Sequence, residues 1–125
     1  MKLLDGKAII DAHDFILSRS PGLVGMSDAG RADAVASRIS NALAYGEIDR
    51  DLFVVAGLYT VAIARGHIFN DANKRTAFVV AVRFLLRNGV TLQNNRQILE
   101  SAIIAAATGE ADYINLSEIY RSLQA

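Results

Sequence analysis

The sequence contains no cysteine and only one proline among its 125 residues. Without cysteine the chain has no disulfides, thiolate nucleophiles or zinc–thiolate sites, and this composition suits a cytoplasmic protein. The formal net charge is zero, so no overall positive field draws the chain to nucleic acid or to an anionic membrane. The longest charge-free stretch, residues 52–64, is too short to span a bilayer. We therefore expect a soluble, cytoplasmic protein with no membrane partner.

What the chain does contain is typical of one folded domain over residues 1–125. Hydrophobic residues make up 52% of the sequence and charged residues 21%, which argues against disorder. Apolar residues recur at helical spacing between glycine, proline and asparagine breaks, and the length of the segments favours helices over strands. The predicted fold is all-α, a compact bundle of about six helices at residues 4–19 (or 7–19), 30–44, 51–65, 71–87 (or from 73), 95–107 and 115–123.

A short segment between the first two predicted helices is expected to be a flap. Pro21, Gly22 and Gly25 prevent a helix across residues 20–28, yet Leu23 and its neighbours are too apolar for a simple linker. We expect an ordered, extended flap, with room for a short hairpin. It could cap the core, or it could provide a strand-like edge that aligns a target segment.

The densest polar cluster lies between the two most apolar segments of the chain. Residues 67–75 read His-Ile-Phe-Asn-Asp-Ala-Asn-Lys-Arg. Buried helices on both sides should hold this loop at or near the core, where each unsatisfied polar group costs roughly 2–7 kcal/mol. Such a cost is rarely carried for packing alone, so the cluster is predicted to be a functional site.

The residue types in this cluster suit phosphoryl or nucleotidyl transfer. The first turn of the fourth predicted helix offers free amides and a positive dipole end, which together bind anions. Asn73, Lys74 and Arg75 can contact phosphate oxygens there, Asp71 can hold Mg²⁺ jointly with phosphates, and His67 can act as a general base. Taken singly, Asp71 could be only a helix cap and His67 only a buried imidazole.

Two other groups of charged or polar residues are expected to be less informative. His13-Asp14 resembles the paired ligands of metal phosphohydrolases, but His67 is the only other histidine, so a structural or surface role is expected. The arginines at positions 31, 38, 50 and 65 are scattered along the sequence, so we do not expect direct recognition of DNA.

The loop at residues 67–75 resembles the signature of the Fic/Doc superfamily, and specifically that of the Doc (death-on-curing) toxins of addiction modules. The usual Fic signature is His-Pro-Phe-x-Asp/Glu-Gly-Asn-Gly-Arg-x-x-Arg. Ile68, Ala72, Lys74 and Phe78 replace its proline, first glycine, second glycine and final arginine, as expected for the Doc branch. The resemblance extends to the flap, to residues 64–66 and to residues 106–110, so it covers nearly the whole chain.

The resemblance implies a Fic fold and a protein Ser/Thr kinase. Lys74 replaces the glycine that lets a Fic enzyme place the α-phosphate of ATP at the histidine, so ATP is expected to bind reversed and to present its γ-phosphate. The implied roles are His67 as base, Asp71 as Mg²⁺ ligand, and Asn73, Lys74 and Arg75 as phosphate binders, with Phe69 packed inward. The loss of the final arginine, replaced by Phe78, argues against chemistry that needs a cation at that position.

The implied biological role is that of a toxin in a type II toxin–antitoxin module. The implied target is a threonine of the translation elongation factor Tu, so that phosphorylation inhibits translation. The implied partner is a cognate antitoxin, which would also provide the only link to DNA. Two alternatives stay open: a Fic-type AMP transferase that modifies a protein hydroxyl, and a non-catalytic, antitoxin-binding co-repressor.

Overall fold

The computed structural model describes residues 1–26 and 30–125, and these residues form six helices. The helices are α1 (Gly6–Arg19), α2 (Arg31–Ala44), α3 (Leu52–Arg65), α4 (Asn73–Arg87), α5 (Arg96–Thr108) and α6 (Tyr113–Ser122). In the described part of the chain the only β-type pairings are two isolated bridges. The predicted all-α fold is therefore confirmed. None of the helices in this part is long and apolar enough to cross a membrane.

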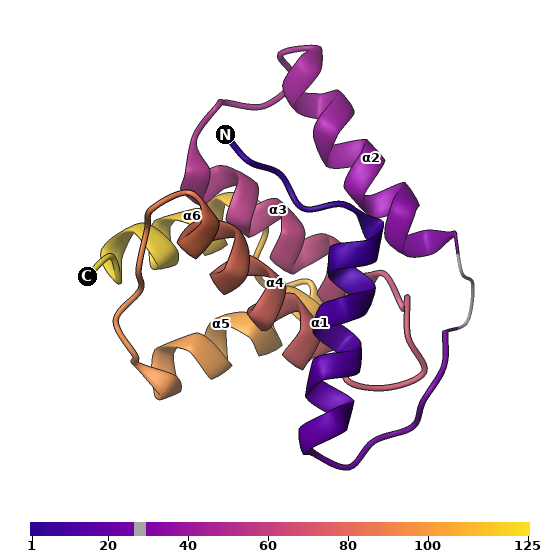
Figure 1. Ribbon diagram of the computed structural model, residues 1–125. Coiled ribbons are helices and arrows are strands. Elements are labelled where there is room, and N and C mark those ends of the chain that lie inside the picture. Colours follow the sequence, from indigo (N-terminus) through magenta and orange to yellow (C-terminus); the bar gives the residue numbers. More distant parts are fainter. Residues whose placement is uncertain (27–29) are drawn as a thin grey trace.

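Helix α3 lies at the centre of the bundle because it is apolar around most of its circumference. It contacts α2, α4, α5 and α6, whereas α1 lies across α4 and α2 (Figure 1). Val55, Tyr59 and Ile63 of α3 are completely buried, as expected for a helix with neighbours on most sides. A Cβ atom at Gly57 would collide with the carbonyl oxygen of Tyr113, so glycine there allows α6 to approach the backbone of α3 directly.

Side-chain caps set the start of four of the six helices. Asp5, Asp51, Asn95 and Asp112 each accept a hydrogen bond from an amide in the first turn of the helix that follows. Helix α6 begins earlier than the predicted Asn115, because Asp112 and Asn115 form a reciprocal capping box around its first turn. The start of α4 has no side-chain cap. This uncapped end directly follows the predicted site loop.

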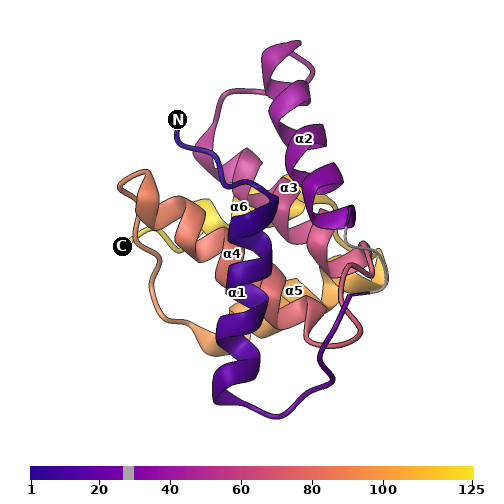
Figure 2. The same ribbon diagram turned by 45° about the vertical axis from the view of Figure 1, so that its right-hand side comes forward.

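Two segments that are distant in the sequence lie side by side at one edge of the bundle. The segment after α1, residues 20–26, runs next to the loop before α4, residues 66–72 (Figure 2). The amide of Asn70 donates to the carbonyl of Gly25 at 3.1 Å, and Met26 forms an antiparallel bridge with Phe69. The fold thereby brings the predicted flap onto the predicted site.

A buried pair of hydroxyl groups joins α3 to α6, and it links the free energy of unfolding to pH in the alkaline range. The hydroxyl groups of Thr60 and Tyr120 lie 2.7 Å apart, and both side chains are fully buried. Burial raises the pKa of Tyr120 to about 12, whereas an unfolded tyrosine ionises near pH 10. Above pH 10 the unfolded chain therefore releases a proton that the folded chain retains.

We expect the free energy of unfolding to be unaffected by this group below pH 10 and to fall by up to about 3 kcal/mol between pH 10 and pH 12. Urea unfolding of the wild type and of Tyr120→Phe at pH 8 and pH 11 measures the effect. The variant loses one hydrogen bond, about 1 kcal/mol at pH 8, and should lose less additional stability at pH 11 than the wild type. Equal losses in the two proteins would contradict the prediction.

Candidate active site

The loop of residues 66–72 combines buried anchors with exposed polar side chains. Ile68 and Phe69 are buried, at 0% and 3% exposure, whereas His67 and Asn70 on either side of them are exposed. The anchors fix the loop against the core, and the side chain of His67 lies at the surface. Phe69 points inward, as the resemblance implied.

Two residues of this loop hold a left-handed backbone. His67 has φ 48° and Ala72 has φ 65°, a region that costs an L-residue roughly 1–2 kcal/mol. Ala72 occupies the position of the first signature glycine, which would adopt this conformation without strain. The turn at Ala72 directs the chain into α4. The loop keeps this strained backbone because burial of Ile68 and Phe69 and hydrogen bonds to Phe69 and Asn70 fix the residues between the two positions.

Asn73 holds the loop from the first turn of α4. Its side-chain oxygen accepts from the amide of Phe69 at 3.1 Å, and its side-chain nitrogen donates to the carbonyl of Phe69 at 2.9 Å. The side chain was predicted to bind phosphate. In the structure its main contacts are with the loop, and one N–H of the amide group is left for a ligand.

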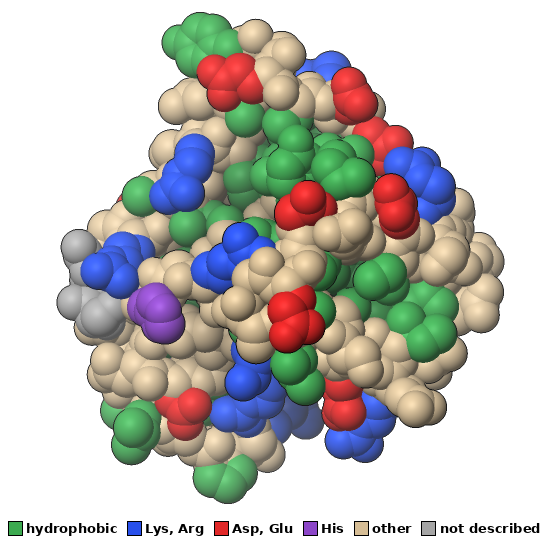
Figure 3. All heavy atoms as spheres, turned by 180° about the vertical axis from the view of Figure 1, so that it is seen from behind, with side chains coloured by type: hydrophobic (Ala, Val, Ile, Leu, Met, Phe, Trp, Pro, Cys, Tyr) green, Lys and Arg blue, Asp and Glu red, His purple; other side chains and the backbone are tan. Residues whose placement is uncertain are grey.

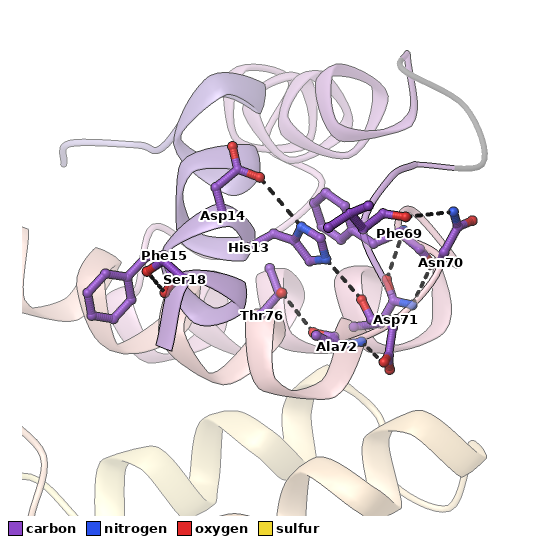
Figure 4. Close-up of polar contacts among 11 residues, drawn as sticks. His13, Asp14, Phe15, Ser18, Phe69, Asn70, Asp71, Ala72 and Thr76 are labelled. Atoms are coloured by element: carbon purple, nitrogen blue, oxygen red, sulfur yellow. Dashed lines mark hydrogen bonds and ion pairs between the residues drawn. The ribbon is translucent and has the colours of Figure 1, made fainter. Parts of the chain in front are cut away.

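His13 projects from α1 toward the loop and contacts Phe69 and Asp71 (Figure 4). Its ring stacks on Phe69 at a centroid distance of 3.8 Å and an interplanar angle of 4°. Nε2 lies 3.0 Å from the carbonyl oxygen of Asp71, and because that oxygen can only accept, Nε2 carries the hydrogen. His13 is only 2% exposed. Of the structural and surface roles that the sequence left open, the structure supports the structural one.

The carboxylate of Asp71 joins the loop to the flap. Its Oδ1 accepts from the amide of Ala72 at 2.7 Å, and its Oδ2 accepts from the amide of Leu23 at 3.2 Å. These two hydrogen bonds stabilise the ionised form and lower the pKa of Asp71 below its usual value. Asp71 therefore remains negatively charged at any pH near neutral.

The flap is attached mainly through its backbone. Besides the bonds at Leu23 and Gly25, the side-chain nitrogen of Asn70 donates to the carbonyl of Val24 at 3.1 Å. The apolar side chains themselves point outward, since Leu23 and Val24 are 67% and 77% exposed. The flap is extended, as predicted, but residues 20–26 contain no hairpin. Its last two predicted residues, Ser27 and Asp28, lie outside the described part.

Two cationic side chains project from the uncapped start of α4. Lys74 is exposed and forms no hydrogen bond or ion pair with the described residues. Arg75 is also exposed, and its guanidinium donates to the hydroxyl of Ser20 at 2.6 Å and to the carbonyl of Pro21 at 3.4 Å. Together with the free amides of the first turn, these groups make the start of α4 electropositive.

An apolar groove of about 560 Å³ begins at this cationic end. Ile16 of α1, Phe78 of α4 and Ile103 of α5 are among its lining residues, and Lys74 and Arg75 line it as well. The groove thus places an apolar surface directly beside the predicted phosphate-binding side chains.

The described residues contain no group of three or more histidine, cysteine or acidic residues close enough to hold a metal ion. Asp71 is the single carboxylate in the loop. Mg²⁺ is commonly bound by one or two carboxylates together with substrate phosphates and water. Each oxygen of Asp71 retains a free lone pair, so Asp71 fits a site for Mg²⁺ that ATP completes.

The chain is similar to known proteins over nearly its whole length. The Fic/DOC family matches residues 3–85. The chain belongs to the Fic/Doc family. One curated relative, named protein kinase Doc, from Escherichia phage P1, is 46% identical over 123 residues, which are 98% of this chain and 96% of the relative. The resemblance to the Doc branch of the family is thereby confirmed, and the identity to a kinase of that branch supports the predicted kinase activity.

Sequence reasoning found the Fic/Doc loop but missed most of what holds it. His13 was judged by its lack of a second histidine–aspartate pair, although it sits on a helix face with the buried residues Ile9, Ala12 and Ile16. That spacing indicates that position 13 faces the core. The hydrogen bond from the amide of Leu23 to Asp71 is made by a backbone group, which every residue except proline has, so the residue type at position 23 does not predict it.

Proposed function

We propose that this protein is a Doc-type toxin that transfers the γ-phosphoryl group of ATP to a threonine or serine hydroxyl of a translation factor. Elongation factor Tu is the proposed target, and inhibition of translation the result. The observation that carries the proposal is the uncapped start of α4, where Lys74 stands in place of the second signature glycine. A side chain at that position occupies space a Fic enzyme leaves open, and it adds a positive charge for the terminal phosphates.

In the proposed reaction His67 accepts the proton of the acceptor hydroxyl. The hydroxyl oxygen forms a bond to the γ-phosphorus while the bond from that phosphorus to the β–γ bridging oxygen breaks, and ADP leaves. Lys74, Arg75 and the first amides of α4 hold the phosphate oxygens in line with this attack. One N–H of Asn73 is free to join them.

Asp71 is the residue proposed to hold Mg²⁺ with ATP. When bound, the ion neutralises charge that develops on the phosphate oxygens. The hydrogen bonds from Ala72 and Leu23 point the carboxylate in a fixed direction and keep it ionised.

The proposed reaction is tested with ATP labelled at either the α or the γ phosphate and with elongation factor Tu as acceptor. We expect label on the acceptor only from the γ position. Label from the α position alone would identify an AMP transferase instead. No transfer from either position would favour the non-catalytic co-repressor. In Lys74→Gly, which restores the Fic residue, we expect γ-phosphoryl transfer to fall.

Replacing Asp71 with asparagine should raise the Mg²⁺ concentration needed for half-maximal transfer about tenfold or more, because a neutral amide oxygen is a weaker ligand than a carboxylate. Transfer rates measured across a Mg²⁺ titration, with wild type and variant side by side, check this. Because the pKa of Asp71 is lowered, protonation of Asp71 itself should not raise the wild-type requirement between about pH 6 and 8. An unchanged requirement in Asp71→Asn would argue against Asp71 as the ligand.

The proposed partner is a cognate antitoxin, and the groove between α1, α4 and α5 is its proposed binding place. The groove is apolar, and Ile104, one of its lining residues, is 54% exposed. A protein segment seated there would cover Lys74 and Arg75 and would compete with ATP. This competition is measured as a rise in the apparent KM for ATP when the antitoxin is added.

A further inference from the structure

A second cleft, which shares no lining residue with the apolar groove, is lined by three arginines. It lies between α2 and the last turns of α3, has a volume of about 430 Å³, and its lining includes Arg31, Arg38 and Arg65. These arginines are scattered in the sequence, but α2 and α3 bring them to one cleft. The described residues that line it include no acidic side chain, although the chain as a whole is neutral.

The cleft is attached to the site loop by one of these arginines. The guanidinium of Arg31 donates to the carbonyl oxygens of Gly66 and His67, both at 3.2 Å. On this face of the molecule several basic side chains gather near the exposed histidine side chain (Figure 3). A molecule lying in the cleft would therefore extend to the backbone that carries the proposed base.

The three arginines differ in the hydrogen bonds that they form within the protein. Arg65 donates through Nε and Nη2 to the carbonyls of Ala106 and Ala111, both at 2.6 Å. Arg31 and Arg65 are thus held in place and still keep N–H groups for a ligand, since each guanidinium has five. Arg38 is exposed and makes no hydrogen bond or ion pair with the described residues. Among the described residues no acidic group pairs with this cation.

The shape of the cleft favours an extended chain over a single small anion. Arg31 and Arg38 are separated by seven positions on α2, which corresponds to about 10 Å along the helix, the length of roughly three extended residues. Ala34, Val61 and Ala62 line the cleft beside the arginines and are at least partly exposed. A lining of small apolar side chains and cations fits a peptide that carries carboxylates and apolar side chains.

We propose that this arginine cleft docks an acidic, extended segment of the protein substrate and so brings the acceptor hydroxyl to His67. This inference rests on the proposed kinase function. Within that function the triphosphate already has a cationic place at the start of α4. The cleft is therefore left for the other substrate, and its positive charge selects a negatively charged surface.

The experiment compares Arg38→Glu with a matched control, Arg50→Glu. Both residues are exposed and without a hydrogen bond or ion pair in the described part of the chain, and both substitutions change the net charge equally. Arg50 precedes the first turn of α3, at the end of that helix remote from the cleft. Transfer to elongation factor Tu is measured at low and high salt, with KM determined separately for the acceptor and for ATP.

For Arg38→Glu we expect the KM for the acceptor to rise about tenfold at low salt and less at high salt, with kcat and the KM for ATP unchanged. Arg50→Glu should behave as the wild type. Equal acceptor KM values in all three proteins would overturn the proposal, and so would a rise in the KM for ATP, which would identify the cleft as a nucleotide site.

A binding measurement separates failure of this proposal from failure of the kinase function. His67→Ala alone, and combined with Arg38→Glu or Arg50→Glu, is tested for binding to elongation factor Tu. Weaker binding only with Arg38→Glu supports the cleft whether or not phosphoryl transfer is seen. Equal binding by all three overturns the cleft and leaves the kinase proposal standing.

Discussion

Replacing His67 with alanine is expected to reduce phosphoryl transfer by about 10²–10⁴-fold, the usual contribution of a general base. The fold should be unaffected, because the side chain is exposed while Ile68 and Phe69 anchor the loop. The backbone carbonyl of His67 accepts from Arg31, and this bond remains in the variant. Transfer from γ-labelled ATP and thermal unfolding, measured on the same preparation, test both statements.

The KM for ATP is the informative control for this variant. The groups proposed to bind the phosphates belong to α4, so ATP should bind to His67→Ala about as well as to the wild type. A variant that transfers phosphate normally would remove His67 from the chemistry. A variant that no longer binds ATP would mean that His67 holds the nucleotide instead of activating the acceptor.

Replacing His13 with alanine is expected to give the second largest effect, on both stability and activity. The change removes a buried ring stacked on Phe69 and leaves the carbonyl of Asp71 without its donor. We expect a loss of about 2–4 kcal/mol in the free energy of unfolding. Because the same contacts position Asp71, transfer should fall about 10²-fold even where the variant is fully folded.

A second substitution separates the ring stacking of His13 from its hydrogen bond to Asp71. His13→Phe keeps an aromatic ring against Phe69 but cannot donate to the carbonyl of Asp71. If the hydrogen bond positions the loop, His13→Phe should recover most of the stability while kcat stays low and the Mg²⁺ requirement stays raised. Full recovery of activity in His13→Phe would show that packing alone is needed. Urea unfolding and transfer rates across a Mg²⁺ titration distinguish these outcomes.

The helices could be predicted from the sequence because their signals are local. The apolar circumference of α3 and the breaks at Gly66 and Gly89 depend only on residues close in the chain. Asp112 was not used as a signal, so α6 was predicted to begin too late. Capping is also local, so this part of the error could have been avoided.

The three-dimensional arrangement of the site was harder to predict from the sequence, for a physical reason. His67, Asp71 and Lys74 lie close together in the sequence and could be found as one motif. His13 and Arg31 contact the same loop through the packing of α1 and α2, and no spacing in the sequence encodes that packing. The exposure of Leu23 and Val24 was also unexpected, because hydrophobicity predicts burial, whereas the flap is held by backbone hydrogen bonds.

The way the flap is held has a consequence for how such proteins can evolve. Leu23 and Val24 contribute an amide N–H and a carbonyl oxygen to the bonds with Asp71 and Asn70, and every amino acid except proline can supply both atoms. Gly25 is different, because its φ of 102° favours glycine. Selection can therefore change the outward-facing side chains at positions 23 and 24 without disturbing the hydrogen bonds that hold Asp71 and Asn70.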